Sequence, residues 1–246
     1  MTYDVEVAVI DSTESNYTVS WTYTNFKTNS PNPMVQKLTA VSDDISIDIK
    51  LDALGVLVGV ENWEEVRDYM AQSFDTLRAE FPKSPEIDNM FQQLEVMYSS
   101  KASVEATSIQ DAQQFHNFHG AKYTLNEELT FQMLTSNVHN PEKPFDTDVS
   151  VELEKLDKAN NQYTIRSVTE VNAEQLTEAT YEYMSKIVGN AKDAIIKRED
   201  FTNVSNIVET VSRIHNTGWV LESVLWKEVE SDGVTNKEIR TIQLTK

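Results

Sequence analysis

No cysteine occurs among the 246 residues of the chain. This absence excludes disulfide bonds, metal sites built from thiolates and cysteine nucleophiles. It leaves the cellular compartment open, because disulfides are only one mark of an oxidising environment. Any chemistry of the protein must therefore rest on other side chains.

Glycine is also scarce, with six residues in the whole chain. Loops that cradle phosphate groups depend on glycine, because a backbone without a side chain can approach the anion closely. The sequence contains no GxGxxG, GxxxxGKS/T, GxSxG or HExxH pattern. The usual sequence evidence for a nucleotide-binding protein or a zinc peptidase is therefore missing. We expect no cofactor and no catalytic residues.

Basic residues are few relative to acidic ones: 21 Lys and Arg stand against 40 Asp and Glu, which gives a net charge of −19. Nucleic acids and anionic lipid surfaces are bound through clustered Lys and Arg, so we expect neither as a partner. The acid excess is typical of a well-solvated surface, with a dedicated acidic binding face as the alternative.

Long apolar runs are missing as well. No stretch of about 18 apolar residues occurs, so we expect no transmembrane segment. After Met1 the chain enters a predicted strand directly, without the basic and apolar regions of a leader peptide. We expect that a leader was removed ahead of this sequence, and that the protein is periplasmic or extracellular.

What the chain does contain is strict alternation of apolar residues with acidic or hydroxyl residues. A period of two is typical of a strand with one buried and one solvated face, as in an antiparallel sheet covered on one side. The alternating apolar positions are Val5, Val7 and Val9; Tyr17, Val19, Trp21 and Tyr23; Ile45, Ile47, Ile49 and Leu51; and Val149, Val151 and Leu153. Further strands are predicted near 55–60, 162–171, 203–214, 218–229 and 237–245.

Apolar residues three or four apart predict helices between these strands. A first helix begins at Asn62 and stops at Pro82, a second begins at Ser84, and two more run from about 108 to 119 and from 172 to about 198. The loop 29–33 is rich in Asn, Ser and Pro. These elements predict an α+β fold, in which a curved antiparallel β-sheet forms a half-open barrel with helices packed on its concave face.

The chain divides weakly at 140–144, where Asn and Pro predict a hinge. Residues 4–7 resemble 148–151, and 17–19 resemble 163–165, at nearly the same offset. We predict a single domain, 1–246, with two pseudo-repeats, 1–140 and 145–246, as an alternative organisation. In either case we expect the two halves to share one sheet.

Three segments carry a resemblance to a known architecture: the hairpin 3–26, the turn at Gly55 that enters the helix at Asn62 and Trp63, and residues 215–219 at the start of a long strand. Their order resembles the half-barrel of LolA-like envelope proteins and of uncharacterised secreted or lipid-anchored proteins of Gram-negative bacteria. The resemblance implies a curved sheet capped by helices, with space for an acyl chain between them. It assigns no functional residues.

Two histidines, His116 and His119, are the candidate metal ligands, because residues three apart on a helix share a face. Their alternation with Phe115 and Phe118 favours a structural role beside a buried stripe. Adjacent acids such as Asp43 and Asp44 do not indicate a catalytic pair, since neighbouring side chains diverge on strands and helices.

Aromatic residues offer the most informative candidate site. They predict an ordinary core, or else the lining of a cavity for an apolar or lipidic ligand between sheet and helices. The candidate lining residues are Trp21, Tyr23, Trp63, Phe74, Phe91 and Trp219. We therefore expect a noncatalytic ligand-binding protein; the alternatives are a protein-interaction or structural module whose partner is unknown and meets an exposed sheet edge, and a hydrolase.

Overall fold

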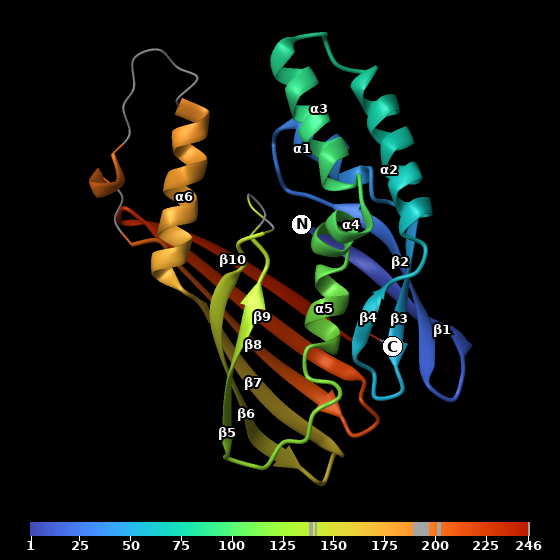
Figure 1. The fold of residues 1–246 in the computed structure, drawn as a ribbon. Coiled ribbons are helices and arrows are strands. Elements are labelled where there is room, and N and C mark those ends of the chain that lie inside the picture. Colours follow the sequence, from blue (N-terminus) through green and yellow to red (C-terminus); the bar gives the residue numbers. More distant parts are fainter. Residues whose placement is uncertain (138–139, 141, 189–196, 201–202, 246) are drawn as a thin grey trace. The chain divides into compact units, whose positions relative to one another are not determined.

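The computed structural model describes residues 1–137, 140, 142–188, 197–200 and 203–245. Within them, ten strands and six α-helices form an α+β fold with two antiparallel sheets (Figure 1). The prediction of an antiparallel α+β fold is confirmed, and the sheets are not closed into a barrel. The expectation of one shared sheet is wrong, because β1–β4 pair in one sheet and β5–β10 pair in another.

The chain divides into two compact units, Met1–Gly120 and Ala121–Lys246. The first unit contains β1–β4 and α1–α5, and the second contains β5–β10 and α6. The predicted hinge at 140–144 lies inside the second unit, between β5 and β6, and residues 138, 139 and 141 are outside the described residues. The prediction of a single domain, with two pseudo-repeats as the alternative, stays a prediction.

The four strands of the first unit follow one another across the sheet in chain order. They are β1 (Thr2–Ser12), β2 (Asn16–Lys27), β3 (Ile45–Asp52) and β4 (Leu57–Val60). Trp21 lies opposite Ile47, and Val19 lies opposite Ile49, and all four side chains are buried. The alternation in the sequence therefore marks a dry face, as predicted, which the helices of this unit cover.

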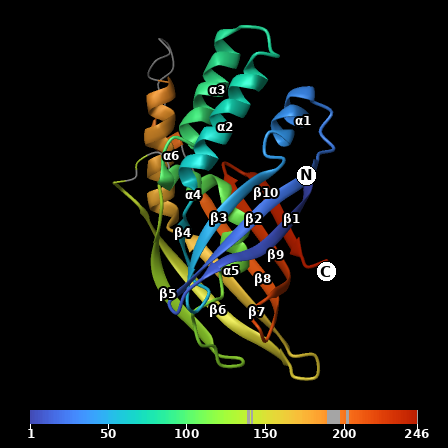
Figure 2. The same cartoon turned by 90° about the vertical axis from the view of Figure 1, so that its right-hand side faces the viewer.

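Five helices belong to the first unit: α1 (Pro33–Ala40), α2 (Trp63–Arg78), α3 (Pro85–Met97), α4 (Lys101–Ser108) and α5 (Gln110–His116). Helix α2 contacts β3, α1 contacts β2, and α4 and α5 contact β4. Figure 2 shows α2 and α3 side by side as an antiparallel pair. Val66, Met70, Phe74 and Leu77 form the buried stripe of α2, in agreement with the predicted spacing.

Helix α1 was not expected, because the sequence at 29–33 reads as a loop. The side-chain oxygen of Asn32 accepts a hydrogen bond from the backbone N–H of Met34 at 2.9 Å, and Pro33 occupies the first helical position. Both features stabilise the start of a helix. The Asn32 oxygen satisfies an N–H group that has no partner within the first turn, and Pro33 lacks an N–H group and has a φ angle suited to the helix. The Asn-Pro pair therefore ends the loop and begins α1.

A tight corner joins the turn between β3 and β4 to the end of α5. Gly55 and Gly120 both adopt positive φ angles, of 83° and 80°. A side chain at Gly55 would place its Cβ 2.9 Å from Cδ2 of His119, and a side chain at Gly120 would collide with Val56. Glycine is therefore required twice here, by backbone conformation and by space.

The second unit is a six-stranded meander in the order β10-β9-β8-β7-β6-β5. Its strands are β5 (Glu128–Thr135), β6 (Phe145–Asp157), β7 (Gln162–Val171), β8 (Ser205–His215), β9 (Val220–Ser231) and β10 (Val234–Gln243). Val149, Val151, Leu153 and Ile165 are buried on one face. Strands β6, β7 and β8 confirm the strands predicted from the alternation at 149–153 and near 162–171 and 203–214.

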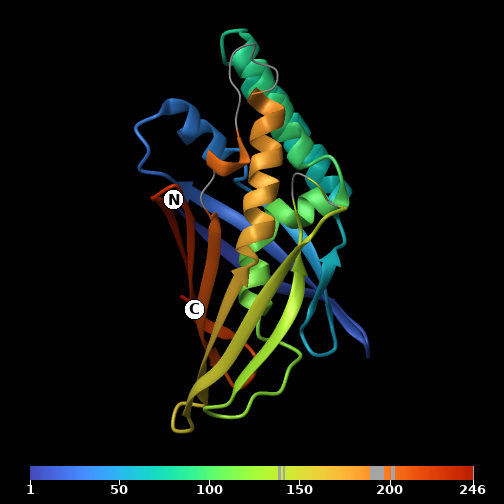
Figure 3. The ribbon, with the colours of Figure 1, turned by 60° about the vertical axis from the view of Figure 1, so that its left-hand side comes forward.

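Helix α6 (Ala173–Val188) connects β7 to β8 and contacts β6 and β8 (Figure 3). The buried hydroxyl of Thr177 accepts a hydrogen bond from the backbone N–H of Val204 at 2.8 Å, which ties α6 to the chain entering β8. Of the helix predicted from 172 to about 198, the structure describes Ala173–Val188, and residues 189–196 lie outside the described residues.

Candidate functional site

Strand β5 is an edge strand that is exposed on both faces. Seven of its eight residues are exposed, and it pairs with β6 without any break in register from Glu128 to Thr135. Leu129, Phe131 and Met133 point to the face that carries Val151, Val149 and Thr147, because directly opposed residues share a face. Their exposures are 37%, 51% and 47%, so β5 presents a row of accessible apolar side chains.

The other long edge strands carry features that oppose pairing with another chain. Strand β1 has register irregularities at both ends, between Thr2 and Asp4 and between Val9 and Asp11, and acids on its solvated face. Strand β10 carries Lys237, Glu238 and Arg240 near its middle. Bulges and charges on edge strands are the usual protection against edge-to-edge association.

The fourth edge, β4, is short and is closed by a helix. It has four residues, and the Glu105 carboxylate of α4 accepts a hydrogen bond from the backbone N–H of Val60 at 2.9 Å. Lys101 lies 3.8 Å from the same carboxylate oxygen. Of the four edges in the described part of the chain, β5 alone combines length, unbroken register and one charged residue at its first position.

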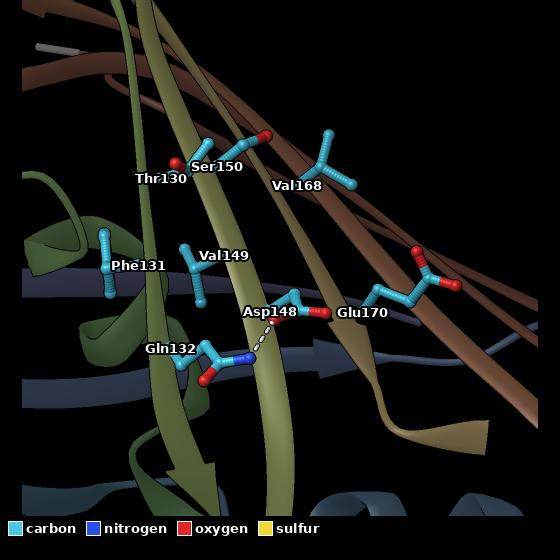
Figure 4. A pocket seen from close by; sticks show the side chains of 8 residues that line it. All are labelled: Thr130, Phe131, Gln132, Asp148, Val149, Ser150, Val168 and Glu170. Carbon is cyan, nitrogen blue, oxygen red and sulfur yellow. Dashed lines mark hydrogen bonds between the residues drawn. The ribbon is translucent and has the colours of Figure 1, made fainter. Parts of the chain in front are cut away.

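A hollow of about 490 Å³ opens beside β5 on the outer face of the six-stranded sheet (Figure 4). Strands β5, β6 and β7 line it, and the lining residues are Thr130, Phe131, Gln132, Asp148, Val149, Ser150, Val168 and Glu170. The amide Nε2 of Gln132 donates a hydrogen bond to Asp148 Oδ1 at 2.9 Å, from one strand to the next. Asp148 lies directly opposite Glu170, so two carboxylates face the hollow.

The two candidate metal ligands do lie together in the first unit. The ring of His116 is 5.0 Å from that of His119 and 6.2 Å from that of Trp21, measured between centroids. Neither ring nitrogen of His116 has a hydrogen-bond partner within the described residues. The same residues contain no group of three or more His, Asp or Glu that could hold a metal ion.

The electrostatics of His116 follow from its position. Burial, and then the neighbouring His119, lower the pKa of His116 from 6.5 to about 4, and the backbone of Gly55 partly opposes this shift. The imidazole is therefore neutral at neutral pH. A neutral, unpartnered imidazole among aromatic rings fits the structural interpretation of the histidines.

The six aromatic candidates for a cavity lining occupy four different places. Trp21 and Tyr23 are buried on β2, and the ring of Trp21 meets Phe115 edge to face at 5.5 Å. Phe74 and Phe91 pack against each other between α2 and α3 at 6.5 Å.

Trp63 and Trp219 complete the set. The guanidinium of Arg67 covers the ring of Trp63 at 5.2 Å, and Trp219, in the β8–β9 hairpin of the second unit, is 41% exposed. None of the six candidates lines the hollow beside β5. Their role as a ligand site stays a prediction.

The site beside β5 is formed by residues other than the predicted candidates. Leu129, Phe131 and Met133 alternate along the chain, and this pattern was available as a signal. It predicts a strand with an apolar face, but not that the strand ends the sheet. Asp148 and Glu170 are likewise ordinary strand acids until the register between β6 and β7 brings them together.

No protein-family model, curated protein or solved structure matches the chain. The resemblance to LolA-like envelope proteins therefore stays a prediction. No helix in the described part of the chain is long and apolar enough to cross a membrane.

Proposed function

We propose that the protein is a noncatalytic protein-interaction module that takes an extended segment of a partner as an additional strand on β5. The single observation that carries this proposal is the unprotected edge of β5, with Leu129, Phe131 and Met133 accessible along it. A free edge offers a row of backbone N–H and C=O groups that an extended peptide can pair with.

The expected affinity of such an edge is modest. Its eight residues span about 27 Å, and each main-chain hydrogen bond contributes about 0.5–1.5 kcal/mol net. Pairing along one strand gives a smaller interface than the roughly 1,200–2,000 Å² of a stable complex. We therefore expect a transient complex, in which the apolar side chains of β5 add affinity to the backbone pairing.

The interior of the first unit supports an interaction module over a ligand carrier. Trp21, Phe74 and Phe91 are buried in contact with other aromatic rings, as in an ordinary core. An apolar or lipidic ligand between sheet and helices, and a periplasmic or extracellular location, stay predictions from the sequence.

Amide hydrogen exchange tests the proposal directly. A short capped peptide of alternating valine and threonine should slow exchange in β5 while leaving β1 and β10 unchanged. Two N-methylated versions of the peptide provide the control, because a strand offers alternate N–H groups to each of its two sides. Methylation of one alternate set should abolish the protection of β5, and methylation of the other set should preserve it.

A matched pair of variants tests whether the peptide binds at β5. Phe131→Ser removes an exposed apolar side chain from β5, and Ile239→Ser removes one from β10, at the opposite edge of the same sheet. We expect weaker peptide binding in Phe131→Ser and unchanged binding in Ile239→Ser. Equal loss in both variants, or equal binding of the two N-methylated peptides, would exclude strand addition at β5.

A further inference from the structure

The outer face of β5 leads into an acidic row of side chains. The register aligns Gln132 of β5, Asp148 of β6 and Glu170 of β7 in one line across the sheet. Gln132 already bonds to Asp148, which shows that side chains on this face reach from one strand to the next (Figure 4). All three residues line the hollow of about 490 Å³.

Three other acids on the same sheet form ion pairs that Asp148 and Glu170 lack. Glu209 pairs with Arg166 at 2.5 Å, Glu222 with Arg213 at 3.1 Å and Glu228 with Lys237 at 2.7 Å. Among the described residues, Asp148 and Glu170 form no ion pair with Lys, Arg or His. The negative charge next to β5 is therefore left uncompensated locally, in a chain whose net charge is −19.

A strand added to β5 would bring its own side chains alongside this row. The added strand would lie two strand spacings, about 10 Å, from β6. Lys and Arg carry their charge on long, flexible stems, and the Asp148 side chain extends toward β5 from the other side. A basic side chain on the outer face of the added strand can therefore approach Asp148, and Glu170 adds to the attraction.

A second copy of β5 would fit this position poorly. Pairing of two β5 strands would bring Glu128 and the neutral side chains Thr130 and Gln132 beside the acids, without any cation. It would also bring two chains of net charge −19 together. Charge complementarity favours a basic partner over self-association.

We infer that the segment accepted by β5 is a cationic strand, with apolar residues placed against Leu129, Phe131 and Met133 and Lys or Arg at the intervening positions, beside Asp148. This inference rests on the proposed function, because it assumes that the partner pairs with β5. It adds the chemical class of the partner, which the edge alone does not specify.

The experiment compares two capped peptides, one of alternating valine and lysine and one of alternating valine and glutamine, by titration against the full chain. Asp148→Asn should weaken the binding of the lysine peptide by about three- to tenfold and leave the binding of the glutamine peptide unchanged. Asp75→Asn, at an exposed position of α2, makes the same change in net charge and should alter neither affinity. Added salt should weaken the binding of the lysine peptide but not that of the glutamine peptide.

The outcomes separate the two proposals. If both peptides slow exchange in β5 but Asp148→Asn binds them as the unmodified chain does, the cationic partner is excluded and strand addition stands. If neither peptide affects β5, the proposed function fails. A dimer joined through β5, detected by light scattering together with exchange protection, would replace the basic partner by a second copy of the chain.

Discussion

The two sheets treat their edges in opposite ways. The four-stranded sheet is protected on both sides, by irregular register and acids in β1 and by the carboxylate of Glu105 at β4. The six-stranded sheet protects β10 with charged residues but leaves β5 regular and apolar. Protection at three edges shows that association is opposed in most of this fold, and the exception marks where a partner is expected.

The comparison extends to the apolar side chains. In the first unit, Phe91 is fully buried between the helices α2 and α3, whereas Phe131 on β5 is 51% exposed. The same residue type therefore serves stability in one region and is available for binding in the other. Three predictions test this difference, and the largest effect is expected in the core.

Phe91→Ala should lower the free energy of unfolding by about 3–5 kcal/mol, because it removes a fully buried ring and leaves a cavity. Phe131→Ala removes the same atoms from an exposed edge and should cost less than about 1 kcal/mol. Urea unfolding of the two variants beside the unmodified chain measures both values. A large cost at Phe131 would mean that β5 belongs to the core, and the contrast between the two regions would disappear.

Acid should destabilise the first unit through protonation of His116. The folded pKa of about 4 lies below the ordinary value of 6.5, so between these values the unfolded chain binds a proton that the folded chain does not. Stability contributed by the neutral imidazole is present above about pH 6.5 and is lost as the pH falls toward 4, by at most about 3 kcal/mol.

His116→Phe provides the matched variant. It replaces a ring whose nitrogens lack partners by an apolar ring of similar shape, so it should leave stability at neutral pH nearly unchanged. Urea midpoints measured through the acid range should fall less steeply in His116→Phe than in the unmodified chain. Parallel curves for the two proteins would show that His116 does not contribute to the acid response.

A smaller effect than those at Phe91 and His116 is expected at the closed edge β4. Glu105→Ala leaves the backbone N–H of Val60 without its acceptor and should cost about 1 kcal/mol, since the carboxylate is partly exposed. Glu105→Gln keeps an acceptor oxygen and should retain most of the stability. Hydrogen exchange at Val60 should accelerate in the alanine variant and much less in the glutamine variant; unchanged exchange in both would show that Glu105 does not close this edge.

Much of the fold follows from local patterns in the sequence. The alternation at 45–51 and at 149–153 correctly predicts buried faces, and the stripe from Val66 to Leu77 correctly predicts α2. These signals depend on residues close in the chain, where period and burial are linked directly. Helix α1 also has a local signal, the Asn-Pro pair at 32–33, which caps and begins the helix.

Pairing between strands was less predictable. Alternation determines which face of a strand is buried, but not which strand lies beside it, so two sheets were mistaken for one. For the same reason, the sequence does not reveal that β5 ends its sheet or that Asp148 lies opposite Glu170. A site built from register and edge position becomes visible only when long-range pairing is known.

The glycine corner of the first unit bears on how mutational scans of this protein should be interpreted. Gly55 and Gly120 would each tolerate few replacements, since any larger residue meets His119 or Val56. Both belong to the first unit, and neither lies on β5. Intolerance at these two positions would therefore report a demand of backbone geometry, and it should be set aside before sensitive positions are used to map partner recognition.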